Sequence, residues 1–257
     1  MKKQEALDRL HAIDRDVKHL SQIAALLQWD QETYMPPAAV EGRSEQLALL
    51  EGIVHEKSTS PEIGGLLEQL GSTTVNPMGD ADLPVVERDF LRVLRKQYDR
   101  AVLLPADLVT EAARAEGLSQ AAWVEARKHN DYITFMPHLE KMVGYAKKKA
   151  ECWGFTERPY DGLLDIHEPG MTETSIEAVF NPLRSRLSSL VQRIGEKNAP
   201  RSDFLSRKFP AELQAQFGES VMKALAYDLQ QGRLDISAHP FTTTLGPRDV
   251  RITTRYF

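Results

Sequence analysis

The clearest chemical pattern lies near the C-terminus, where polar side chains recur at every second residue. In residues 249–256 they alternate with less polar ones: Asp249, Arg251, Thr253 and Arg255 against Val250, Ile252, Thr254 and Tyr256. A β-strand has a period of two, so we expect a strand whose polar side chains share one face. That face is either solvated or forms a hydrogen-bonded wall of a substrate cleft, and the pattern leaves both interpretations open.

A histidine precedes this segment, in the sequence His239-Pro240-Phe241. The residue before a proline is restricted to extended backbone, so Pro240 limits the conformations of His239. An imidazole held in an extended segment can donate a hydrogen bond to a peptide carbonyl. A structural role for a single histidine fits the pattern equally well.

Metal-ligating spacing is absent from the chain. A zinc peptidase helix carries His-Glu-x-x-His, which places two imidazoles on one face beside a general base. His55 would need a second histidine at Thr59, and His167 would need one at Met171. We therefore expect no metal ligands within this chain.

Two weaker pairs, Asp8/His11 and Asp16/His19, have i,i+3 spacing. The apolar stripe of the predicted helix lies on its other side, so we expect these four residues to face solvent.

Nucleophile motifs are also missing. Residues 117–121 read Gly-Leu-Ser-Gln-Ala, which lacks the second glycine of a Gly-x-Ser-x-Gly elbow and lies in a helical pattern. Cys152 has no histidine close in sequence and is interpreted as a packed thiol. We therefore predict no catalytic residue in the chain itself.

Composition narrows the class of protein. The 257 residues include 42% hydrophobic and 27% charged residues, which is typical of a globular protein. The net charge of −5 argues against nucleic-acid binding. A single cysteine, a charged N-terminus without a signal-peptide core and short apolar runs predict a cytoplasmic protein with no membrane partner.

The elements that must position these residues are mostly helical. Apolar spacing of three and four predicts helices, with a loop over 71–82, an irregular connection over 154–171 and proline bends at Pro137 and Pro182. Asp82 is expected to cap one helix. A short strand is expected near 234–237. The predicted helices cover 7–27, 37–54, 60–70, 84–98, 105–129, 132–153, 173–197 and 210–230. The fold class is thus mainly α over 1–230, with a β-containing segment over 231–257.

Four stretches together resemble the carboxypeptidase Taq family of zinc metallocarboxypeptidases. They are Leu-Gln-Trp-Asp-Gln-Glu-Thr-Tyr-Met-Pro at 27–36, Tyr-Asp-Gly-Leu-Leu-Asp at 160–165 with Glu-Pro-Gly-Met-Thr at 168–172, His-Pro-Phe at 239–241, and Asp-Val-Arg-Ile-Thr-Thr-Arg-Tyr at 249–256. The resemblance runs along the whole chain.

The resemblance implies a helical metallopeptidase domain that removes C-terminal residues from peptides with broad specificity, and a homodimer when complete. It implies that zinc or another divalent metal is bound by a His-Glu-x-x-His helix and a further Glu beyond Phe257. The apolar end at Phe257 likewise favours a continuation. Residues 1–257 would then be the N-terminal portion of a single domain, without metal or catalytic residues and inactive alone.

The resemblance also assigns roles to residues that are present. It implies that His239 donates to a substrate carbonyl and that Asp249 and Arg251 pair to shape the cleft wall. Phe241 and Thr253 complete the expected substrate-binding set.

Two other interpretations of the function stay open. One is another helical zinc peptidase, such as an oligoendopeptidase. The other is a non-catalytic helical module that binds peptides or regulates a relative.

Overall fold

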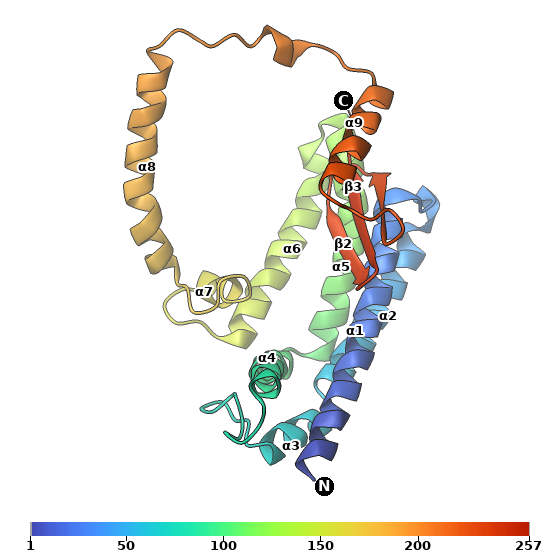
Figure 1. Cartoon of the computed structure of the whole chain (residues 1–257), viewed down its shortest axis with the longest axis vertical. Coiled ribbons are helices and arrows are strands. Elements are labelled where there is room, and N and C mark those ends of the chain that lie inside the picture. The colour runs from blue at the N-terminus through green and yellow to red at the C-terminus, as the bar shows by residue number, and fades with distance from the viewer. Residues whose placement is uncertain (1, 257) are drawn as a thin grey trace. The chain divides into compact units, whose positions relative to one another are not determined.

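A computed structural model describes residues 2–256 and shows a mainly helical chain with a small sheet near its C-terminus (Figure 1). The chain divides into two compact units. One comprises Met1–Lys148 with Gln231–Thr254, and the other Lys149–Gln230 with Arg255–Phe257. The predicted fold class, mainly α with a β element near the C-terminus, is confirmed.

The first unit contains the long helices and the sheet. The helices are α1 (Lys3–Thr33), α2 (Val40–Ser58), α3 (Pro61–Gln69), α4 (Val85–Ala101), α5 (Ala106–His129) and most of α6 (Tyr132–Trp153), with a 3-10 turn at Pro37–Ala39. The strands are β1 (Gly232–Ile236), β2 (Thr242–Gly246) and β3 (Asp249–Thr254). None of the described helices is both long and apolar enough to span a bilayer.

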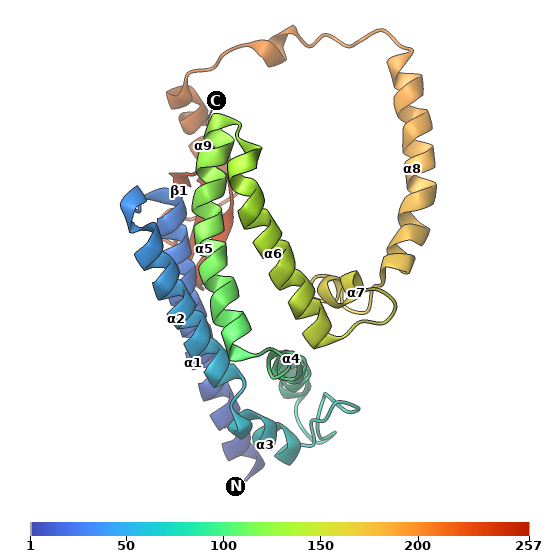
Figure 2. The ribbon, with the colours of Figure 1, turned by 180° about the vertical axis from the view of Figure 1, so that it is seen from behind.

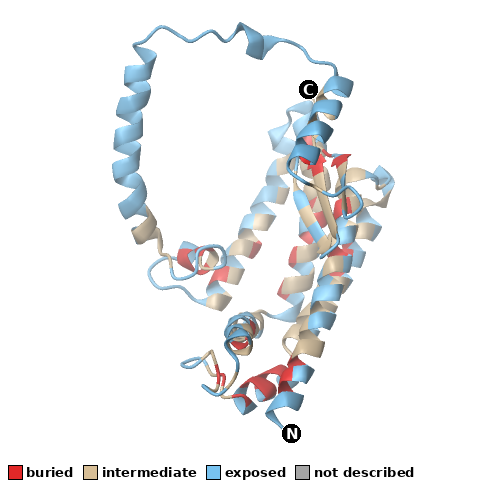
Figure 3. Ribbon diagram, viewed as in Figure 1, coloured by how far each residue is buried: buried red, intermediate tan, exposed pale blue. Residues whose placement is uncertain are grey.

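The hydrophobic core of this unit joins the start of α1 to α3 and α4, and Figure 3 colours its residues red. Leu10 of α1, Leu67 of α3 and Leu91 of α4 are completely buried. Helix α3 begins where its sequence predicts, because Ser60 accepts a hydrogen bond from the Glu62 backbone N–H and Pro61 takes the first turn. This core anchors the N-terminal end of α1. The site residues lie near the C-terminal end of the same helix.

Helices α1, α2 and α5 run side by side (Figure 2). Helix α2 packs closely on α5 at Gly117, where a Cβ atom would lie 2.7 Å from Ser44 Oγ. Arg43 of α2 donates to the Leu27 carbonyl and, at 2.8 Å, to Asp30. Gln31 donates to the Gly117 carbonyl at 2.8 Å. The last turns of α1 are thus fixed by two neighbouring helices.

The sheet has the strand order β1-β3-β2, with β1 parallel and β2 antiparallel to β3. Its register places Arg233 beside Arg251 and Asp235 beside Thr253. The polar face of β3 packs on α1, since Arg251 lies 4.3 Å from the centre of the Trp29 ring. The polar face is therefore not freely solvated at Arg251, and its role as a wall of a substrate cleft stays a prediction.

The second unit holds α7 (Pro159–Leu164), α8 (Glu173–Gly195), a 3-10 turn (Asp203–Ser206) and α9 (Ala211–Ala224). Buried Asp161 accepts hydrogen bonds from the backbone N–H groups of Glu157, Arg158 and Glu173. These three bonds tie the starts of α7 and α8 together and hold the pKa of Asp161 below its ordinary value.

Several sequence predictions were wrong in detail. Residues 154–171, predicted to be irregular, include α7, and β2 was not predicted. Helix α9 ends at Ala224 rather than 230, and Ala226 adopts a positive φ of 57°. Asp82 does not cap α4, whose N-cap is Pro84; it pairs with Lys3 instead.

Asp8, Asp16 and His19 are exposed as predicted, whereas His11 is only partly exposed. Its ring stacks on Phe90, with centroids 4.1 Å apart, and Nε2 lies 2.8 Å from a Glu87 carboxylate oxygen. The prediction for His11 was based on the periodicity of α1 alone, which does not show where α4 packs.

Candidate functional site

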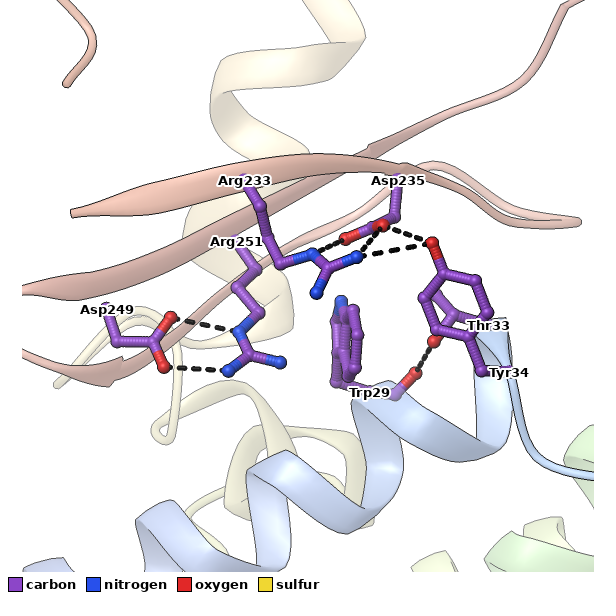
Figure 4. A network of polar contacts seen from close by, with 7 residues as sticks. All are labelled: Trp29, Thr33, Tyr34, Arg233, Asp235, Asp249 and Arg251. Carbon is purple, nitrogen blue, oxygen red and sulfur yellow. Dashed lines mark hydrogen bonds and ion pairs between the residues drawn. The ribbon is translucent and has the colours of Figure 1, made fainter. Parts of the chain in front are cut away.

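Two ion pairs, each between an arginine and an aspartate two residues apart, lie side by side on β1 and β3 (Figure 4). On β3, Arg251 donates twice to Asp249, at 2.9 and 2.8 Å. On β1, Arg233 donates twice to Asp235, at 2.6 and 2.7 Å. Residues two apart in a strand share a face, so each pair closes within its own strand. The Arg251 guanidinium holds the pKa of Asp249 below its ordinary value.

The two neighbouring guanidinium groups both contact the ring of Trp29. Like charges side by side in a sheet repel each other. Here each arginine has its own carboxylate, and both lie over the buried indole ring, at 4.3 Å for Arg251 and 5.0 Å for Arg233. The negative face of an indole attracts cations. Trp29 therefore links the end of α1 to the sheet.

Tyr34 closes the network from the end of α1. Its hydroxyl donates to Asp235, and Arg233 donates to the same hydroxyl at 3.3 Å. The hydrogen bond to Asp235 raises the pKa of Tyr34. Thr33 donates to the Trp29 carbonyl at 2.6 Å, which closes the last turn of the helix.

The segment from Ser237 to Phe241 is attached to β3 by hydroxyl groups. Thr253 Oγ1 lies 2.7 Å from Ser237 Oγ and accepts from the Phe241 N–H at 2.8 Å. Ser237 in turn donates to the His239 carbonyl at 2.8 Å. Ser237 and Thr253 are both buried, whereas His239 is exposed.

The His239 ring lies near residues of α1 and α5. It meets the Trp123 ring edge-on, with centroids 6.0 Å apart. Half-buried Glu32 accepts from Gln120 at 3.2 Å, and burial raises its pKa while the nearby His239 opposes that rise. This corner thus combines an imidazole, an aromatic ring and a carboxyl group whose proton is held more tightly than usual.

The structure brings the sequence-predicted site residues into two groups. Asp249 and Arg251 form the expected ion pair. Phe241, in the segment that carries His239, is joined by hydrogen bonds to Thr253 of β3. Whether these five residues contact a substrate stays a prediction.

Sequence reasoning missed several residues of the network as site residues: Trp29, Glu32, Tyr34, Trp123, Arg233 and Asp235. One signal was present, because Arg233-x-Asp235 reads as the reverse of Asp249-x-Arg251. The positions of Glu32 and Trp123 beside His239 have no local signature.

Residues 2–256 contain no group of three or more His, Cys, Asp or Glu side chains placed to hold a metal ion. The described residues therefore do not fit a metal centre, and the roles of the network are derived without one.

Comparisons with known proteins match nearly the whole chain to carboxypeptidases. The family described as carboxypeptidase Taq (M32) metallopeptidase matches residues 9–257. Thermostable carboxypeptidase 1 of Thermus thermophilus is 37% identical over the whole chain, which covers 52% of that relative. Carboxypeptidase 1 of Bacillus subtilis is 32% identical over 93% of the chain and 47% of its own length.

Solved structures give the same result. The M32 carboxypeptidase of Deinococcus radiodurans has a TM-score of 0.81 and 35% identity over 98% of this chain and 50% of its own. The chain thus spans about half the length of the relatives it matches.

Proposed function

The chain belongs to the carboxypeptidase Taq (M32) metallopeptidase family, and from this premise we propose that it forms the N-terminal part of a metal-dependent carboxypeptidase. The complete protein would release C-terminal residues from peptides with broad specificity, use zinc, form a homodimer and act in the cytoplasm. The chain alone would be inactive, with the metal ligands supplied by sequence outside it.

The proposed contribution of this chain is one wall of the substrate cleft. The observation that carries it is the packing of the paired Arg251 on Trp29, next to the segment that presents His239. A guanidinium held by a carboxylate and an aromatic ring keeps one orientation, as recognition of a peptide requires. A peptide in extended conformation can add to an outer strand of the sheet.

Individual roles follow from this placement. His239 would donate to a substrate carbonyl from its exposed position, and Phe241 would line the adjoining surface. Arg251, oriented by Asp249, would present the remaining guanidinium surface to the peptide. Thr253 belongs to the same proposed set, and its side chain is buried.

A chimera tests the proposal. Residues 1–257 replace the first half of Thermus thermophilus carboxypeptidase 1, and release of the last residue of acetyl-Ala-Ala-Ala is measured with and without a chelator. We expect metal-dependent release from the free acid and none from the C-terminal amide. His239→Ala and Arg251→Ala should each lower kcat/KM by about tenfold to a hundredfold, the size expected for one lost charge-assisted hydrogen bond.

The controls separate failure of assembly from failure of function. Val75→Ala, at an exposed position between α3 and α4 and outside the sheet, should leave kcat/KM unchanged. The intact relative, substituted at the aligned histidine and arginine, reports on both roles if the chimera does not assemble. Unchanged turnover in both substituted relatives would remove these residues from the proposed site.

The same assay distinguishes the other readings. Cleavage of the C-terminal amide would favour an endopeptidase. Release of the C-terminal residue by residues 1–257 alone, abolished by a chelator, would contradict the proposed inactivity. Binding of acetyl-Ala-Ala-Ala to residues 1–257 by calorimetry, with an inactive chimera and unaffected substituted relatives, would favour a non-catalytic peptide-binding module.

A further inference from the structure

The exposed His239 lies in a short segment that connects β1 to β2 outside either strand. Backbone bonds attach the two ends of this segment to β3: Ser237 N–H donates to the Thr254 carbonyl at 3.0 Å, and Thr253 N–H donates to the Phe241 carbonyl at 2.8 Å. Pro240, between them, has no N–H to donate. Side chains add further bonds to the middle of the segment.

Two buried hydroxyl groups provide these bonds. Ser237 Oγ donates to the His239 carbonyl at 2.8 Å and lies 2.7 Å from Thr253 Oγ1. Thr253 Oγ1 accepts from the Phe241 N–H at 2.8 Å and lies 3.3 Å from the Phe241 carbonyl, to which it donates. The two hydroxyl groups thus connect the His239 carbonyl with Phe241.

We propose that Ser237 and Thr253 are positioning residues that fix the backbone of His239, and thereby hold its imidazole against Trp123 and near Glu32. Thr253 is only 3% exposed and its hydroxyl is engaged on both sides. It therefore acts on a substrate through His239 and not by direct contact. This proposal rests on the proposed function only for the use of His239; the hydroxyl chain stands on the geometry.

Removing the Ser237 hydroxyl frees the His239 carbonyl, and removing the Thr253 hydroxyl takes away the group that holds Ser237 and Phe241. Thr253→Val keeps the shape and the β-branched side chain but deletes the side-chain bonds to Ser237 and Phe241. Ser237→Ala deletes the middle of the chain and leaves β3 untouched. Thr253→Ser keeps the hydroxyl and should restore the native arrangement.

Nuclear magnetic resonance of histidine-labelled chain tests this without metal or peptide. The His239 Cε1–H signal is assigned by its loss in His239→Gln, and its displacement by the Trp123 ring current is calibrated with Trp123→Leu. We expect Thr253→Val and Ser237→Ala to lose most of this displacement, and Thr253→Ser to retain it. Thr244→Val, the matched control on β2, should not change the signal.

Two results would overturn the proposal. One is an unchanged His239 signal in folded Thr253→Val and Ser237→Ala; if the former does not fold, the latter decides. The other is a change spread over all histidine signals, since Thr253 would then stabilise the unit as a whole. Unchanged turnover in the substituted relatives together with the expected His239 shifts would reject the proposed use of His239 and leave the positioning role intact.

Discussion

Helices α1 and α8 are both long and amphipathic, yet they differ in what covers their apolar side chains. Helix α1 buries Ala6, Leu7, Leu10, Ala24 and Trp29. Helix α8 has no buried residue. Its apolar side chains remain exposed along its length: Phe180 56%, Leu183 42%, Leu187 47%, Leu190 47% and Ile194 59%. Apolar periodicity thus predicts a helix without showing what it packs against.

The arginines at the two helices also differ in their surroundings. Arg233 and Arg251 lie on the Trp29 ring of α1 with a carboxylate each. The arginines of α8, such as Arg186, lie on an exposed surface. A charge contributes most to stability where its partners exclude water. An arginine packed on Trp29 should therefore stabilise the fold more than an arginine on the exposed surface of α8.

The largest expected difference concerns apolar truncation. Leu67→Ala removes a completely buried side chain from the core beneath α1 and should lower the free energy of unfolding by about 2–5 kcal/mol. Leu187→Ala, the matched truncation on α8, should change it by less than about 0.5 kcal/mol. Urea denaturation followed by circular dichroism measures both. Equal losses would mean that the α8 side chains are covered in solution.

A smaller difference is expected for arginine. Arg251→Ala removes the ion pair with Asp249 and the contact with Trp29, and should cost about 1–2 kcal/mol after allowance for the partly exposed carboxylate. Arg186→Ala should lie within about 0.5 kcal/mol of the unsubstituted chain. Unfolding midpoints in urea compare the two. A loss for Arg186→Ala as large as that for Arg251→Ala would contradict the comparison.

The smallest effect expected is a difference in response to acid and salt. Asp249 and Asp161 both have lowered pKa values, the first through Arg251 and the second through the Glu173 and Arg158 backbone N–H groups. A carboxyl with a lowered pKa stabilises the fold above its unfolded pKa, near 4. That contribution is lost as pH falls through the folded pKa.

Asp249→Asn and Asp161→Asn should therefore each lose less stability than the unsubstituted chain when pH is lowered from about 6 to about 3. Added salt should weaken the Asp249 effect, because it depends on a partly exposed ion pair. Added salt should not change the Asp161 effect, which depends on hydrogen bonds from backbone N–H groups to a buried carboxylate. Urea midpoints at two pH values and two salt concentrations check this. Equal salt sensitivity would contradict the distinction.

The sequence by itself determined most of the helices, the mainly α fold class and the strand at Asp249–Thr254. These follow from local rules: apolar spacing, proline positions and a period of two. It also placed Asp249 and Arg251 on one face, because residues two apart in a strand share a face, and the family resemblance implied their pairing. The four family-like stretches agree with the comparisons along the whole chain.

Only the tertiary structure decided that β1 lies parallel to β3, so that Arg233 comes beside Arg251. It alone placed Trp29 beneath both guanidinium groups and Glu32 and Trp123 beside His239. The contacts of Trp29, Glu32 and Trp123 join residues separated by more than a hundred positions in the chain. Local periodicity carries no information about such pairings, since they depend on how complete elements pack together.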